Sequence, residues 1–421
     1  MPGHKRNEQF GITGAEIDIT EIDGFDNLHD AKDVLLDIEN KLSDIYKSKK
    51  SYMLVNGSTV GMLSAICAVC DEGDKVIVAR NCHKSVYNAC FLKSLKVVYI
   101  EPDFDNVHGF YKGISQKKLD DLLTENCDVK AVIITSPTYE GFVSNIKTDV
   151  PLIIDCAHGA HFGLADFPAY PKADIVVSSL HKTLPALTQT AVLNVYNEKF
   201  LQKVKFYLDI FETSSPSYVL MNSVGICVDF VWNHSDAFQS FYSELLQFRK
   251  ISLDKLSLVL TDDLSKMIVS TAASDISGCD LAEMLRREFH IEVEMASKNY
   301  VILMTSVADT KEAFRNLESA LLAIDRRIHK AANSVICKPP VFKGVHEISV
   351  SNKSVSCDLC DSSGRYSNEF VYAYPPDIPV LVPDELITKE VVDYLLLMHH
   401  SGVNIISDSA QFPNKLLTKG D

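Results

Sequence analysis

An acid and a lysine, each at the end of an apolar run, are the residues of this sequence that most directly suggest chemistry. The run 152–154 ends at Asp155, and the apolar segment 174–178 leads within a few residues to Lys182. A lysine amine can form a Schiff base with an aldehyde, and a buried carboxylate needs a partner such as a protonated pyridine nitrogen. Pyridoxal phosphate offers both groups on one ring. The pair therefore predicts a pyridoxal phosphate site anchored at Lys182.

A candidate phosphate-binding turn lies upstream of this pair. The stretch 56–61, Asn-Gly-Ser-Thr-Val-Gly, follows a predicted strand and opens a predicted helix. Free N–H groups at a helix N-terminus bind phosphate, and hydroxyl groups add further donors. An ordinary capped helix would start in the same way, but the place of the stretch before Asp155 and Lys182 favours the phosphate. We assign Ser58 and Thr59 to the cofactor phosphate.

Two further side chains suit the faces of the cofactor ring. His83 follows the end of a predicted strand, where an imidazole can stack on a ring, although a histidine at a helix terminus would give the same pattern. Ala157 is small enough to pack on the opposite face. His158 is a candidate for the cofactor site or for a structural role, and so is His161.

The elements that must position these residues alternate along the chain. Apolar strand candidates at 51–55, 75–79, 96–100, 131–135, 152–155 and 174–178 are separated by helical segments such as 61–70, 84–94 and 116–123. This pattern predicts an α/β fold with a mostly parallel sheet, helices on both faces and ligands at the carboxyl ends of the strands. We expect an arm at 1–30, a large domain at 31–245, a small α+β domain at 246–330 and a C-terminal segment at 331–421. In the small domain, 290–294 is a predicted strand, and 331–345 reads as a connector.

Composition excludes several classes of protein. The chain has 421 residues and a formal net charge of −15, so we expect no nucleic-acid partner, which would need concentrated Lys and Arg. No apolar run reaches the ~18 residues of a membrane span, and no secretory signal is found, so a cytoplasmic location is expected. The odd count of 11 cysteines favours reduced thiols. Cys357 and Cys360 form a C-x-x-C with only Cys337 nearby, so we predict no metal site.

Motifs spread along the chain give it a recognisable pattern. Together they resemble the bacterial ornithine/lysine/arginine decarboxylases of the aspartate-aminotransferase fold, and the length resembles the short form of that family. The motifs are Pro-Gly-His-Lys at 2–5, Asn-Gly-Ser-Thr at 56–59, Arg-Asn-Cys-His-Lys-Ser at 80–85, Thr-Ser-Pro-Thr-Tyr at 135–139, Asp-Cys-Ala-His-Gly-Ala-His at 155–161, Ser-Leu-His-Lys at 179–182, Ser-Ser-Pro-Ser-Tyr at 214–218 and Tyr-Pro-Pro at 374–376.

The resemblance implies a role for each motif. It makes Lys182 the Schiff-base lysine, Asp155 the partner of the pyridinium and His83 the stacking residue. It places Ser179 and His181 around the phosphate, with Ser58 and Thr59. It also implies a homodimer or higher oligomer with active sites at the subunit interface.

Three positions depart from the family pattern. Cys156 stands where a glutamate usually follows the pyridinium aspartate, and Asp377 and Asp384 stand where the family has glycine. An aspartate adopts a positive φ angle less readily than glycine does. The C-terminal segment of this family helps to shape the substrate end of the site, so these changes bear on the substrate.

The reaction that the resemblance implies is α-decarboxylation of a basic amino acid, with arginine first and lysine or ornithine next. The cationic end of such a substrate needs an acid, and Asp26 and Glu385 are candidates, with Tyr139 as a further contact. Two other classes stay open at this point. One is an aminotransferase or lyase that has diverged from the decarboxylases, and the other is a non-catalytic relative.

Overall fold

The computed structural model describes residues 2–331, 336 and 338–420. These residues fall into two compact units, one within 1–71 and 151–240 and one within 72–150 and 241–421. The four consecutive ranges expected from the sequence divide the chain differently and stay a prediction. Part of the expected connector 331–345, including Cys337, lies outside the described residues.

A sheet of buried strands is the centre of the first unit. Its strands, in the order β1–β9–β8–β7, are β1 (Lys50–Leu54), β9 (Ala191–Val195), β8 (Ile175–Ser179) and β7 (Leu152–Asp155). β7 and β8 are parallel, with Asp155 opposite Val177, whereas β9 is antiparallel to both β8 and β1. Every residue of β7, β8 and β9 is buried, as expected for strands covered on both faces.

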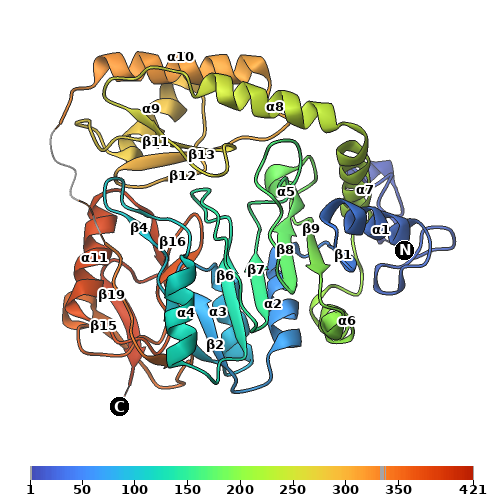
Figure 1. The fold of residues 1–421 in the computed structure, drawn as a ribbon, viewed down its shortest axis with the longest axis horizontal. Helices are drawn as coiled ribbons and strands as arrows, with labels where there is room; N and C mark the ends of the chain where they lie inside the picture. The colour runs from blue at the N-terminus through green and yellow to red at the C-terminus, as the bar shows by residue number, and fades with distance from the viewer. Residues whose placement is uncertain (1, 332–335, 337, 421) are drawn as a thin grey trace. The chain divides into compact units, whose positions relative to one another are not determined.

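The helices of the first unit pack on this sheet and on one another. They are α1 (Val34–Tyr46), α2 (Gly57–Val69), α5 (Leu180–Thr183), α6 (Leu201–Phe211) and α7 (Tyr218–Asn233), with short 3-10 turns at Glu8–Phe10, Leu28–Asp30 and Glu198–Phe200. α2 packs on β8 and β9, α6 packs on α2, and α7 packs on α1 (Figure 1). Most of α2 is buried, and this burial agrees with its apolar residues on all sides.

The second unit contains the remaining parallel strands and an antiparallel edge strand. In the order β6–β2–β3–β14 these are β6 (Ala131–Thr135), β2 (Lys75–Ala79), β3 (Lys96–Ile100) and β14 (Val345–Glu347). β2 is parallel to both β6 and β3, and β14 joins β3 in antiparallel orientation. The loop after β2 leads into α3 (Lys84–Leu92), and α4 (Gln116–Glu125) precedes β6. A two-stranded ribbon, β4 (Phe104–Asp105) with β5 (Phe110–Tyr111), lies between α3 and α4 in the sequence.

The rest of the second unit consists of small antiparallel sheets with their own helices. One sheet, β10–β11–β13–β12, is formed by Ser257–Val259, Lys266–Ser270, Tyr300–Met304 and Met295–Ala296. α9 (Gly278–Phe289) packs on β12 and β13, and α10 (Lys311–Arg327) packs on α9. α8 (Ser235–Phe248) links the two units along the chain. This segment is therefore a sheet covered by two helices, and its expected boundaries as a separate domain stay a prediction.

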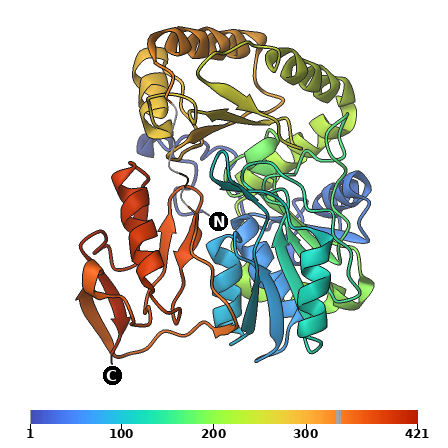
Figure 2. The same ribbon diagram turned by 60° about the vertical axis from the view of Figure 1, so that its left-hand side comes forward.

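The C-terminal residues form two further sheets. β15 (Ser354–Asp358) pairs with β19 (Lys415–Lys419), and β16 (Val371–Ala373) pairs with both β17 (Ile378–Leu381) and β18 (Ile405–Ser407). A 3-10 turn at Leu359–Asp361 follows β15. α11 (Lys389–His400) contacts β17 and β18, and Figure 2 shows the red and orange C-terminal residues as a helix with small sheets.

One predicted strand is wrong. Residues 290–294 form no strand, because His290 ends α9 in the left-handed conformation with φ 56°. The N–H group of Ile291 then donates to the carbonyl of Leu285 and closes the helix end. Among the described residues, no helix is both long and apolar enough to cross a membrane.

Candidate active site

Lys182 lies one turn beyond the carboxyl end of β8. The strand ends at Ser179, and α5 starts at once and carries the lysine in its last turn. The Nζ atom of Lys182 lies 3.1 Å from Nε2 of His158, which is buried. An ammonium group can only donate hydrogen bonds, so a charged Lys182 donates to Nε2 of His158. The structure therefore joins these two predicted site residues directly.

Asp155 ends the strand that neighbours β8. It is 4 % exposed, and its Oδ1 atom accepts a hydrogen bond of 3.0 Å from the backbone N–H of Ala157. Because β7 and β8 are parallel, Asp155 and the residues after Ser179 come to the same edge of the sheet. A buried carboxylate at this edge is well suited to a cationic partner. Asp155, Ala157 and Lys182 thus lie on adjacent elements of one unit.

The turn between β1 and α2 has the features of a phosphate site. Gly57, the first residue of α2, has φ 79°, a conformation that glycine adopts without strain. Asn56 occupies the N-cap position but makes no capping bond with its side chain. The hydroxyl of Ser179 donates to that of Ser58 at 3.0 Å. The structure therefore brings Ser58 and Ser179 together at an uncapped helix N-terminus, a favourable place for an anion.

Thr59 and His181 are the other two residues that are predicted to lie around the cofactor phosphate. Thr59 is exposed in the first turn of α2. Nδ1 of His181 donates to the carbonyl of Thr190 at 2.9 Å, so this nitrogen carries the proton. Burial and, to a smaller extent, the charge of Lys182 lower the pKa of His181 against the opposing effect of the Thr190 carbonyl. We infer that His181 is neutral at pH 7, with Nε2 as an acceptor.

His83 belongs to the second unit, where it forms the N-cap of α3. Its Nδ1 atom accepts a hydrogen bond of 3.1 Å from the N–H of Ser85 and lies 2.9 Å from the Ser85 hydroxyl. Its Nε2 atom lies 3.8 Å from Oδ2 of Asp377. These contacts fix the ring within its own unit. Stacking of this ring on a cofactor stays a prediction.

The two aspartates at family glycine positions both have the backbone conformation that glycine favours. Asp377 has φ 66° and Asp384 has φ 75°. The side chain of Asp384 accepts a hydrogen bond from Ser349 at 2.7 Å and pairs with Lys419 at 2.6 Å. These contacts offset the strain of its positive φ angle. Cys156, the third departure, is fully buried. Both aspartates therefore adopt the positive φ angle that is more difficult for aspartate than for glycine.

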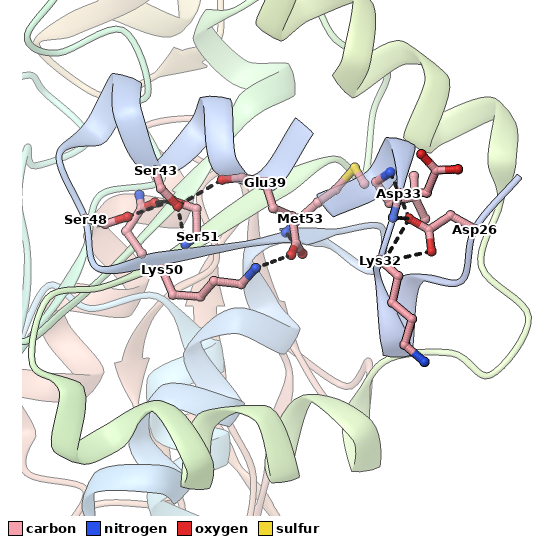
Figure 3. Close-up of polar contacts among 11 residues, drawn as sticks. Asp26, Lys32, Asp33, Glu39, Ser43, Ser48, Lys50, Ser51 and Met53 are labelled. Atoms are coloured by element: carbon pink, nitrogen blue, oxygen red, sulfur yellow. Dashed lines mark hydrogen bonds and ion pairs between the residues drawn. The ribbon is translucent and has the colours of Figure 1, made fainter. Parts of the chain in front are cut away.

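Asp26, a predicted substrate contact, is hydrogen-bonded to backbone groups close to it in the sequence. Its carboxylate accepts hydrogen bonds from backbone N–H groups of the loop and of the start of α1, and part of this arrangement is visible in Figure 3. The donors are Asn27, Lys32, Asp33 and Leu35. Partial burial would raise the pKa of Asp26, but these four donors outweigh it and lower the pKa. Its contact with a substrate stays a prediction.

The other two predicted substrate contacts also have partners in the protein. The hydroxyl of Tyr139 donates to Glu294 at 2.7 Å. Glu385 is 1 % exposed, and its Oε2 atom accepts hydrogen bonds from Arg80 at 3.3 Å and from the N–H of Val382 at 2.8 Å. Burial raises the pKa of Glu385 against the opposing charge of Arg80. A role of Tyr139 or Glu385 at the substrate stays a prediction.

Sequence reasoning missed the residues that support the phosphate turn. Glu212 and Thr213 lie at the end of α6, and they hydrogen-bond the residues just before Gly57. Nothing in the local pattern around Glu212 points to this contact, because its partner is 157 residues away in the sequence. Among the described residues, no group of three or more His, Cys, Asp or Glu side chains is placed to hold a metal ion.

Comparison with solved structures defines the class of fold. The chain resembles the constitutive lysine decarboxylase of Escherichia coli with a TM-score of 0.79 and 15% sequence identity, over 100% of this chain and 79% of that chain. At this identity the resemblance shows the α/β fold alone. The expected fold class is confirmed.

Sequence comparison then shows the family. Residues 3–258 match the family described as "Orn/Lys/Arg decarboxylase, major domain". The uncharacterized protein YaaO of Bacillus subtilis (strain 168) is 32% identical, over 94% of this chain and 89% of that protein. Arginine decarboxylase of the same organism is 26% identical, over 96% of this chain and 91% of that enzyme. The chain belongs to the Orn/Lys/Arg decarboxylase family and is an amino-acid decarboxylase.

Proposed function

We propose that this chain binds pyridoxal phosphate in its first unit and catalyses α-decarboxylation of a basic amino acid, with arginine as the first candidate. Lysine and ornithine follow. The observation that supports this most directly is the placement of Asp155 and Lys182 after two adjacent parallel strands. Family membership supports the reaction class, and the match to arginine decarboxylases over most of the chain supports the order of substrates.

The residues of the first unit fit the cofactor. A buried acid, Asp155, suits a protonated ring nitrogen, and the amine of Lys182 suits an aldehyde. The hydroxyls of Ser58 and Ser179 lie together at the uncapped start of α2, which suits a phosphate group. Acid, amine and anion site are the three groups that hold this cofactor.

When bound, pyridoxal phosphate supplies an electron sink for the pair released as the substrate carboxyl group leaves. Asp155 keeps a proton on the ring nitrogen because the buried carboxylate stabilises the adjacent positive charge. Lys182 and His158 can share a proton between Nζ and Nε2, since these atoms are 3.1 Å apart. We propose that this pair would return a proton to the substrate Cα atom.

We also propose a homodimer or higher homo-oligomer with active sites at the subunit interface. Support comes from the N-terminal arm, which exposes large apolar side chains, such as Phe10 at 58%, Ile12 at 53% and Phe25 at 47%. Exposure of this much apolar surface to water is unfavourable and is typical of a protein interface. Nearby, a cavity of about 540 Å³ is lined by Ile17, Val34 and other residues of the arm, α1 and α7. Sedimentation equilibrium of the purified chain tests this proposal, and a monomer at micromolar concentration contradicts it.

The reaction is tested by incubating the purified chain with pyridoxal phosphate and arginine, lysine or ornithine in separate reactions. Carbon dioxide and the amine product are followed together. We expect equal amounts of both, with the highest rate for arginine. Keto acid without carbon dioxide would contradict decarboxylation and favour the aminotransferase alternative, and a highest rate with lysine or ornithine would contradict only the order of substrates.

A further inference from the structure

Glu212 is a buried acid that none of the roles above uses. It directly follows α6 as the C-cap residue, and its side chain is directed at the turn between β1 and α2. It is 7 % exposed, and its Oε1 atom accepts a hydrogen bond of 2.8 Å from the N–H of Val55. The next residue, Thr213, donates its N–H to Oδ1 of Asn56 at 3.0 Å. Two successive residues after α6 therefore hold two successive residues before α2.

This contact decides what the start of α2 can bind. An asparagine at the N-cap position normally accepts a hydrogen bond from the second or third N–H of its helix. In α2 these N–H groups belong to Ser58 and Thr59. Asn56 makes no such bond, and its Oδ1 atom accepts a hydrogen bond from the N–H of Thr213 instead. The N–H groups of Ser58 and Thr59 are thereby kept for another acceptor.

Glu212 and Thr213 are themselves held in place. The carbonyl of Thr213 accepts a hydrogen bond of 2.8 Å from Nε2 of His29, and Nδ1 of His29 lies 3.0 Å from Asp209. The α6 helix that carries Asp209 and leads to Glu212 packs on α2. The turn is thus fixed both by direct hydrogen bonds and by the helix behind it.

We propose that Glu212 is a positioning residue for the cofactor phosphate, acting with Thr213 to keep the β1–α2 turn open to that anion. This inference rests on the proposed function, because the anion is the phosphate of pyridoxal phosphate. It predicts an effect that is specific for the phosphate group. A residue with a merely structural role would affect the binding of the whole cofactor.

Glu39 of α1 provides a matched control, because it accepts a hydrogen bond from β1. It is also a buried glutamate, and its Oε1 atom accepts a hydrogen bond from the N–H of Met53 at 3.3 Å. Its Oε2 atom binds Lys50 at 2.7 Å, as Figure 3 shows. Met53 lies within β1, whereas Val55 lies beyond the end of the strand at the turn. Loss of Glu39 therefore removes a similar bond without touching the phosphate turn.

The test compares the affinity for pyridoxal phosphate with that for pyridoxal, which lacks the phosphate group. Both dissociation constants are measured by absorbance titration of wild type, E212A, E212Q and E39A. Without Glu212 the turn is no longer held open for the anion, so we expect E212A to bind pyridoxal phosphate about tenfold more weakly, which is about 1.4 kcal/mol of binding free energy. Pyridoxal affinity should stay within about twofold of wild type.

The other variants distinguish the outcomes. E212Q keeps an oxygen for the N–H of Val55, so its affinity for pyridoxal phosphate should stay close to that of wild type. E39A should leave the ratio of the two affinities unchanged. If E212A lost affinity for both ligands equally, or for neither, the positioning role of Glu212 would be overturned, but the proposed function would not. A wild-type chain that binds neither ligand would overturn the proposed function and, with it, this inference.

Discussion

A methyl group added at Gly61 tests how closely α2 must approach the sheet that carries the site. A Cβ atom at this position would lie 2.6 Å from Cγ1 of Val177 and 2.8 Å from Cδ1 of Leu54. Both side chains are buried, and Val177 belongs to β8, so neither can move freely. Overpacking costs about 1–3 kcal/mol, and the two contacts at 2.6 and 2.8 Å put this case at about 2–3 kcal/mol, of which replacing glycine by alanine within a helix returns about 1 kcal/mol. We expect Gly61→Ala to lower the free energy of unfolding by about 1–2 kcal/mol.

The assay is urea denaturation followed by circular dichroism, with a lower midpoint and an unchanged slope expected for Gly61→Ala. Gly225→Ala is the control, because the Cβ atom added in α7 would lie 3.1 Å from the flexible end of Ile38. That variant should be as stable as wild type or more stable by up to about 1 kcal/mol. Equal or higher stability of Gly61→Ala relative to wild type would refute the close packing of α2 on β8.

Two further predictions concern buried and strained acids of the second unit. Burial raises the pKa of Glu140 to about 7 from an ordinary 4.5, so its contribution to stability is present below pH 4.5 and is lost as the pH rises to 7. The free energy of unfolding of wild type, relative to that of Glu140→Gln, should fall by roughly 3 kcal/mol between pH 4.5 and 7. Urea denaturation at each pH measures both free energies. If they changed with pH in the same way, the result would contradict this prediction. Glycine suits a positive φ, so Asp377→Gly should raise the melting temperature in a thermal scan, by more than Asp384→Gly, which also loses the contacts with Ser349 and Lys419. The reverse order would show that strain at Asp377 is small.

The sequence was sufficient for the parts of the site that depend on strand ends. Asp155 and Lys182 follow apolar runs, and because such runs form parallel strands, both residues come to one edge of the sheet. The N-terminus of α2 was predictable for the same reason, from a strand followed by a Gly-Ser-Thr turn.

The remaining features depend on contacts between distant segments or on single backbone angles. The hydrogen bond between Glu212 and Val55 joins residues far apart in the sequence, so no local pattern predicts it. The strand expected at 290–294 fails because His290 adopts a left-handed conformation, which its apolar and β-branched neighbours do not reveal. The antiparallel direction of β9 likewise depends on how the chain returns from α5, and the apolar pattern of a buried strand is the same in both directions.

The central claim is that Lys182 holds pyridoxal phosphate, and covalent trapping tests it most directly. The chain is incubated with the cofactor, reduced with borohydride, digested and analysed by mass spectrometry. We predict that the phosphopyridoxyl group is found on the peptide that contains Lys182, and that Lys182→Ala acquires neither this mass nor visible absorbance. Label on another lysine, or an unchanged cofactor absorbance in Lys182→Ala, would contradict the account.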